Sequence, residues 1–340
     1  MLRHGLLERR LALILIAIAI IYAALMSYFS FLRYTDFYTS NWDLGIAMQS
    51  LWTNTHGYLL YESGDYESFG VLSFLQVHST YIAISISYIY GIYPSPLLLF
   101  IIQSVFVTLS VVPIYFISKK VGLSASATIF IVLLFLLNFS IISGILYDFH
   151  WESLIPVEFF TLFLLVLEKR YYLSLGVFAI GCMTLEIFPF ILVGVIFYFF
   201  LTKYLPGSNK TSLWTDIPNS ILLSFLLIAI FSYFLIRYAQ YDLIPLLVHE
   251  PINTGKTVST AINLFSFHIS LSNISESILY WFMIILTLGM LPLFSPKLLL
   301  IAAPWVFYTF FLAVGFTTAF GNQDSLLTTP YAMLVVCPPK

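Results

Sequence analysis

Four short groups of polar residues stand out in this apolar sequence because their side chains could do chemistry. They are Asp43; Gln76 with His78; Asp148, His150 and Glu152; and Glu186. Carboxylates and imidazoles can act as general bases and as the groups that orient them, or can bind a divalent ion through oxygen and nitrogen ligands. Both kinds of chemistry remain open. We predict three catalytic acids, Asp43, Asp148 and Glu186, and three residues that contact substrate, His78, His150 and Glu152.

The first of these acids lies in Asn41–Trp52, which reads NWDLGIAMQSLW. Its apolar residues recur at helical spacing, which predicts an amphipathic helix on a membrane surface with Asp43 at its N-terminal edge. The alternative role for Asp43 is that of an N-cap for this helix. Glu186 is harder to assign to structure alone, since an acid between two membrane half-helices is costly and is by default a functional candidate.

The composition identifies a polytopic membrane protein. Hydrophobic residues make up 60% of the 340 residues and charged residues only 9%. A soluble core of this size could not shield so much apolar surface, so we predict an all-α bundle of transmembrane helices that forms one integral membrane domain over residues 1–340. Nothing in the sequence suggests a nucleic-acid partner. Cys182 and Cys337 lie in apolar runs and are expected to be packing residues.

Charge placement predicts the topology. Leu11–Leu32 is long enough to cross about 30 Å of hydrocarbon, and the arginines before it place the N-terminus in the cytoplasm of a cell-membrane protein. Residues 33–70 then form an acidic first external loop. Three basic clusters are assigned to the cytoplasmic side: Lys119-Lys120, Glu168-Lys169-Arg170 and Lys203–Lys210.

This assignment places Asp148 and Glu186 outside the membrane, with Asp43. It requires that Val71–Tyr93 does not cross, so we predict an interfacial or re-entrant segment shielded by protein. The chain ends inside what should be a membrane span, at Cys337-Pro338-Pro339-Lys340, and we therefore expect a truncated chain or a short terminal helix.

Four motifs resemble a known family in order and spacing. They are DLGIAMQSLW at 43–52, YPSPLLLFIIQ at 93–103, YDFHWE at 147–152 and LPLFSPKLLLIAAPW at 291–305. The family is the domain of unknown function number two thousand and seventy-nine. It is similar in turn to the GT-C class of membrane glycosyltransferases, which includes dolichyl-phosphate-mannose-dependent protein mannosyltransferases and aminoarabinose lipid A transferases.

The resemblance implies a GT-C-like fold, surface helices in the first external loop and a catalytic acid there, matched by Asp43. It also implies a second external acid about a hundred residues later, matched by Asp148. Where the family usually has Lys-Glu-Asp, this chain has Leu185-Glu186-Ile187, so a cation for a donor phosphate is missing at that position.

We therefore predict transfer of a sugar from a polyprenyl-phosphate donor to an acceptor at the outer face, in contact with membrane lipid. Asp43 would be the general base, and the leaving group would be stabilised by a cation or by His78 and His150. Gln49 and Trp52 are further candidates for substrate contact. A Mg or Mn ion, with Asp43, Asp148 and His150 as ligands, is the candidate cofactor.

Two functions of other classes remain open. The first is a transporter or lipid flippase, in which Asp148, His150 and Glu186 form a polar path. The second is a non-catalytic membrane scaffold. Because a fold does not fix a function, the site geometry must decide between them and the glycosyltransferase.

Overall fold

The computed structural model describes residues 2–39, 41–186, 188–204, 217–249, 271–294 and 300–311. Within these ranges the chain is helical and contains no β-strand, and Tyr61 and Ser73 form an isolated antiparallel bridge. The predicted all-α class is confirmed. The expected membrane span in which the chain ends, with Cys337, lies outside the described residues.

Within the described ranges, three helices are long and apolar enough to cross a membrane: Leu7–Thr35, Pro96–Lys120 and Asn219–Leu247. The first belongs to α1 (Leu2–Thr35), the second joins α6 (Pro96–Leu109) to α7 (Val111–Lys120), and the third joins α13 (Asn219–Tyr238), η2 (Ala239–Leu243) and α14 (Ile244–Leu247). A fourth span is formed if the pair α8 (Ala125–Leu136) and α9 (Phe139–Tyr147), bent by 40°, is counted as one. The protein is therefore polytopic.

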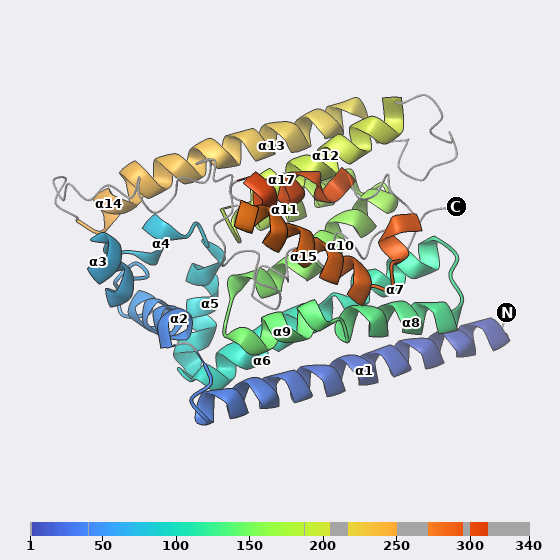
Figure 1. Ribbon diagram of the computed structural model, residues 1–340, viewed down its shortest axis with the longest axis horizontal. Helices are drawn as coiled ribbons and strands as arrows, with labels where there is room; N and C mark the ends of the chain where they lie inside the picture. Colours follow the sequence, from blue (N-terminus) through green and yellow to red (C-terminus); the bar gives the residue numbers. More distant parts are fainter. Residues whose placement is uncertain are drawn as a thin grey trace.

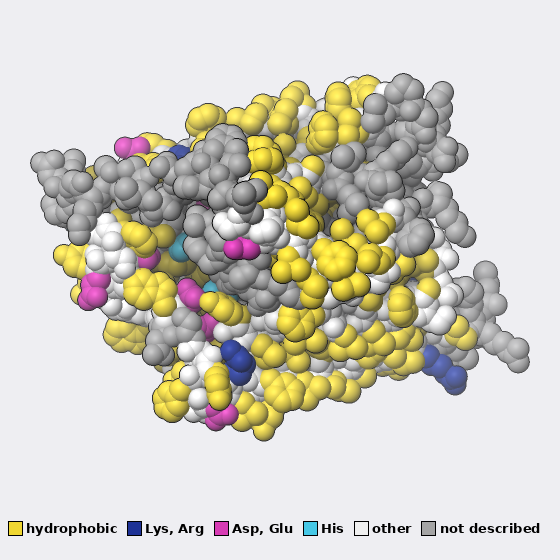
Figure 2. All heavy atoms as spheres, viewed as in Figure 1, with side chains coloured by type: hydrophobic (Ala, Val, Ile, Leu, Met, Phe, Trp, Pro, Cys, Tyr) yellow, Lys and Arg dark blue, Asp and Glu magenta, His cyan; other side chains and the backbone are white. Residues whose placement is uncertain are grey.

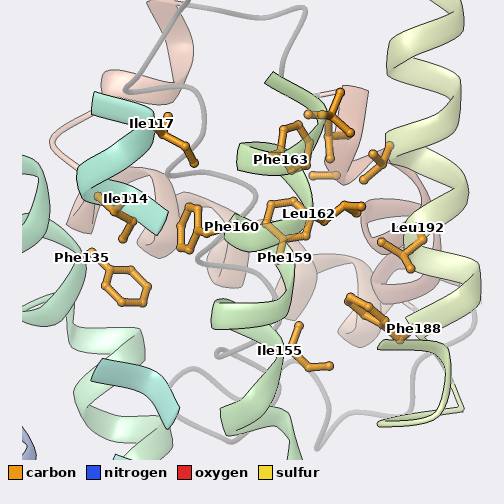
Figure 3. Close-up of a cluster of buried hydrophobic side chains, with 14 of the residues drawn as sticks. Ile114, Ile117, Phe135, Ile155, Phe159, Phe160, Leu162, Phe163, Phe188 and Leu192 are labelled. Carbon is orange, nitrogen blue, oxygen red and sulfur yellow. The ribbon is translucent and has the colours of Figure 1, made fainter. Parts of the chain in front are cut away.

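The remaining helices of the bundle are shorter. They are η1 (Trp151–Leu154), α10 (Ile155–Leu167), α11 (Tyr171–Cys182), α12 (Phe188–Tyr204), α15 (Leu271–Thr287), η4 (Leu291–Phe294), η5 (Leu300–Ala302) and α17 (Ala303–Phe311). Among these, α10 lies at the centre of the core. Its Phe159, Phe160 and Phe163 are buried and lie between α7 and α8 on one side and α12 on the other (Figure 3).

Close helix packing holds this core together. Lipid tails are as apolar as these side chains, so van der Waals contact rather than escape from water drives association inside a membrane. Gly181 lies against the Phe188 ring, and Gly194 lies against Pro304 and the carbonyl of Ile301, so there is no room for a Cβ at either glycine. Both glycines therefore set how closely α12 approaches its neighbours.

Four short helices form a layer at one end of the bundle, on the left in Figure 1. They are α2 (Asn41–Asn54), α3 (Ser63–Phe69), α4 (Phe74–Val77) and α5 (Ile82–Ile92). The 11 residues of α5 extend over only about 16 Å, well short of about 30 Å of hydrocarbon. The segment 71–93 thus lies at this end of the bundle, and its failure to cross the membrane stays a prediction.

The opposite end of the bundle holds the beginning of α1 and the end of α7 (Figure 1). An ion pair of 2.9 Å between Lys119 and Glu8 joins these two helix ends. Between the two ends the chain passes back and forth, so the loops that follow α9 and α11 return to the layer of short helices. This alternation is what brings acids from distant parts of the sequence together.

Candidate functional site

All eight predicted site residues lie at the end of the bundle that carries the short helices, and six of them are grouped together there. Asp43 is in the first turn of α2, and His78 is the C-cap of α4. Asp148 caps the C-terminus of α9, while His150 and Glu152 are at the start of η1 and Glu186 lies between α11 and α12. Acidic and histidine side chains are visible together in a hollow at this end (Figure 2, left). We call these six residues the acid–histidine cluster.

Asp43 faces His150. Its Oδ2 atom is 3.9 Å from His150 Nε2, and about a third of its side chain is exposed (36%). Because α2 begins at Asn41, Asp43 lies inside the first turn of the helix and is not its N-cap. The helix dipole still favours a carboxylate in this first turn. Partial burial raises the pKa of Asp43, and the nearby His78 lowers it in part.

His78 and Glu186 form an ion pair. Nδ1 of His78 and Oε1 of Glu186 are 3.0 Å apart, and the backbone N–H of Ser79 donates to Glu186 Oε2 at 3.0 Å. Burial lowers the pKa of His78, but the Glu186 carboxylate and other nearby acids more than offset this and raise it to about 9. His78 is therefore a cation at neutral pH, and 46% of its side chain is exposed.

His150 has the opposite electrostatic character. Only 7% of the residue is exposed, and burial together with the charge of His78 lowers its pKa to about 3. It is therefore a neutral imidazole. Its Nε2 atom is buried and has no hydrogen-bond partner among the described residues, and its Nδ1 is 3.9 Å from Glu152 Oε2. The structure thus separates the two histidines that the sequence analysis treated alike.

Two further acids of the cluster hold protons near neutral pH. Burial raises the pKa of Asp148 to about 7, against opposing hydrogen bonds from the backbone amides of Phe149 and Leu44. Burial also raises the pKa of Glu152 to about 7. Neighbouring carboxylates contribute to both shifts, because like charges in a small volume disfavour ionisation.

Gln103, which the sequence analysis missed, holds the His150 loop in place. Its amide donates to the carbonyls of Ile145 and Asp148 at 2.6 and 2.9 Å and accepts from the backbone N–H of His150 at 2.8 Å. The sequence does contain a signal for this role, because Gln103 is an amide side chain within an apolar span, where a polar group needs hydrogen-bond partners.

Asp65 was also missed. It is 3% exposed, lies next to Glu62 and contributes to the raised pKa of His78. Glu62 accepts hydrogen bonds from the backbone N–H groups of Gly64 and Asp65, so it is the N-cap of α3. With Glu62 beside it, burial raises the pKa of Asp65 to about 8.

Gln49 and Trp52 lie away from the acid–histidine cluster. Both line a different cavity of about 730 Å³, between α2 and α14. The cause is helix geometry: Trp52 is nine residues, or about two and a half turns, beyond Asp43 and so lies on the opposite face of α2. The structure does not bring these two residues to the site.

The predicted metal ligands are not assembled. Among the described residues, no three His, Cys, Asp or Glu side chains are grouped as they would be around a metal ion. Asp148 instead accepts from the backbone N–H of Phe149 at 2.9 Å through Oδ1, and Asp43 is 3.9 Å from His150. The requirement for Mg or Mn stays a prediction, and no step below depends on it.

Comparison with known proteins gives one family. A family model described as "Predicted membrane protein (DUF2079)" matches residues 33–336. The chain belongs to this family. The predicted membership of this family is confirmed, whereas the family's description states no activity and the similarity to the GT-C class stays a prediction. No curated protein and no solved structure matches the chain. The DUF2079 assignment therefore establishes a membrane protein, and its function must be inferred from the site.

Proposed function

We propose that this DUF2079 protein is a membrane glycosyltransferase that moves a sugar from a polyprenyl-phosphate donor to an acceptor hydroxyl at the outer face of the cell membrane. The observation that carries the proposal is the placing of Asp43 against neutral His150, with cationic His78 at the same end of the bundle. This arrangement offers a base for the acceptor and a positive charge for the donor phosphate.

Asp43 is the general base of the proposed reaction. The acceptor oxygen attacks the anomeric carbon, its proton passes to Asp43, and the bond from that carbon to the phosphate oxygen breaks with its electron pair going to polyprenyl phosphate. A carboxylate whose pKa is raised is a stronger base than an ordinary aspartate. His150 is a positioning residue because its buried Nε2 atom faces the carboxylate.

His78 is the group that stabilises the leaving phosphate. A charge-assisted hydrogen bond from an imidazolium to a phosphate oxygen is among the stronger hydrogen bonds, and it strengthens as charge develops on that oxygen. Glu186 keeps His78 protonated at neutral pH. His78 would thus supply the cation that is missing at Leu185, where the resemblance leads us to expect a lysine.

The lipid tail of the donor has a suitable groove between spans. A cavity of about 420 Å³ lies between α1 and α6–α7 and is lined by apolar side chains, among them Leu15, Ile16, Val112 and Phe116. An isoprenoid chain has no polar groups to satisfy in such a groove.

The distribution of basic residues supports an external site. Lys119 and Lys120 end α7 at the end of the bundle opposite to the acid–histidine cluster. Because basic residues favour the cytoplasmic side, the cluster belongs outside, where polyprenyl-phosphate sugars would be used.

A transfer assay tests the proposal. The full chain in lipid nanodiscs is given labelled polyprenyl-phosphate hexoses and a membrane extract as acceptor. We expect transfer by the natural protein and a fall of about 10²–10⁴-fold in Asp43→Asn, the range for loss of a general base. Asp36→Asn is the matched control, because Asp36 is an exposed acid in the same loop.

Two results would contradict the proposal. One is equal turnover by Asp43→Asn and the natural protein. The other is gradient-driven flux of lipid or solute in liposomes without any transfer, which would favour the transporter.

A further inference from the structure

The cavity between α2 and α14, which Gln49 and Trp52 line, is at the same end of the molecule as the acid–histidine cluster. It lies on the face of α2 opposite to Asp43. Its volume is about 730 Å³, within the range usual for small-molecule sites. The residues that line it are Gln49, Trp52, Thr53, Gly57, Tyr58, Leu59, Tyr61, Leu72, Leu247, Val248 and His249. None of the six residues of the acid–histidine cluster is among them.

Aromatic rings and uncharged polar groups dominate the chemistry of this lining. Trp52 is 46% and Tyr58 65% exposed, although both are large apolar side chains. One face of the Trp52 ring is stacked on His56, with centroids 3.9 Å apart, and His56 does not line the cavity. The cavity is therefore lined by the part of the Trp52 indole that His56 does not cover.

The polar groups of the cavity are also fixed in place. Oε1 of Gln49 accepts from both the backbone N–H and the hydroxyl of Ser63, at 3.0 Å each, which leaves the amide NH₂ group to donate. The hydroxyl of Thr53 donates to the carbonyl of Tyr61 at 2.7 Å. His249 adopts a left-handed backbone with φ 56°, a strained conformation that often occurs at ligand sites.

We propose that this cavity is a saccharide-binding site, separate from the acid–histidine cluster. A pyranose ring has one face of C–H groups that packs on aromatic rings, and hydroxyl groups around its edge that need uncharged donors and acceptors. The cavity offers Trp52, Tyr58 and Tyr61 for the first and the Gln49 amide for the second.

The groove between α1 and α6–α7 provides a contrast within the same molecule. Its only side-chain polar groups are the hydroxyls of Thr108 and Tyr115, and the rest of its lining is aliphatic or Phe116. That surface fits a lipid tail. The α2–α14 cavity combines aromatic, amide and imidazole groups, which a lipid tail would leave without hydrogen bonds.

Isothermal titration calorimetry with neutral oligosaccharides tests this site. The full chain in nanodiscs is titrated with linear gluco- and manno-oligosaccharides. We expect binding that weakens at least tenfold in Trp52→Ala and in Tyr58→Ala. Tyr66→Ala is the matched control, because Tyr66 is 51% exposed in the same loop but does not line the cavity. Trp52→Phe, which keeps an aromatic ring, should retain most of the affinity.

Asp43→Asn should bind these sugars as tightly as the natural protein, because Asp43 is on the opposite face of α2. The assay uses no donor and no turnover, so its outcome is independent of the proposed glycosyl transfer. Absence of binding to every oligosaccharide, or unchanged affinity in Trp52→Ala, would overturn the saccharide site.

Discussion

Replacing Glu186 by Gln should lower the pKa of His78 and so reduce its positive charge at neutral pH. Glutamine keeps the size of the side chain and can still accept from the backbone N–H of Ser79, so the fold is expected to survive. At 3.0 Å, two unit charges attract by about 1.4 kcal/mol at the dielectric constant of water and by about 5.5 kcal/mol at an effective value of 20. Because 46% of His78 is exposed, the lower part of this range applies.

An attraction of about 1.4–3 kcal/mol corresponds to about 1–2 pKa units. We therefore expect the pKa of His78 to fall from about 9 to about 7–8 in Glu186→Gln. The sign follows from the partner: a carboxylate favours the protonated imidazole, so its loss lowers the pKa.

The assay is an NMR titration of protein labelled with ¹³C in the histidine rings. The 6 histidines are few enough for the His78 signal to be assigned by its loss in His78→Gln. Glu67→Gln is the matched control, since Glu67 is an exposed acid in the same layer of short helices. A His78 pKa that does not change in Glu186→Gln would refute the electrostatic account of this pair.

The remaining predictions concern the two groups that hold the His150 loop. Asp148 has a pKa raised from 3.8 to about 7, so the stability that its protonated form provides is present at low pH and lost as the pH rises through 7. We expect Asp148→Asn to remove this loss, which amounts to about 4 kcal/mol. The variant should therefore have a clearly higher melting temperature than the natural protein at pH 8, and a much smaller advantage at pH 4. The same difference in melting temperature at both pH values would contradict this. Gln103→Leu should cost about 2–4 kcal/mol of stability and most of the transfer activity, because it leaves buried backbone groups of Ile145, Asp148 and His150 without a partner. An unchanged melting temperature in detergent would show that water replaces the amide.

The sequence predicted the class of fold and the convergence of the acids because both depend on local patterns. A composition of 60% hydrophobic residues requires helices or a closed barrel in a membrane, and helical spacing in Asn41–Trp52 predicted α2. Alternation of basic and acidic loops then predicted that Asp148 and Glu186 lie at the same end as Asp43.

The pairing of side chains could not be predicted in this way. His78 and Glu186 are 108 residues apart, and their contact depends on where α4 packs against the turn between α11 and α12. The difference between a cationic His78 and a neutral His150 depends on burial and on which acid is nearest, neither of which is a property of the sequence alone. The position of Trp52 on the face of α2 opposite to Asp43 was predictable from the helical repeat. Trp52 was instead predicted to contact the same substrate as Asp43 because both belong to one sequence motif.

The position of the donor phosphate tests the central claim most directly. A cryo-electron microscopy structure of the full chain in nanodiscs with polyprenyl phosphate should show the phosphate about 3 Å from the ring of His78 and beside Asp43, with the lipid tail in the groove between α1 and α6–α7. Phosphate density at the opposite end of the bundle, near Lys119 and Lys120, would contradict the assignment of the acid–histidine cluster as the site of sugar transfer.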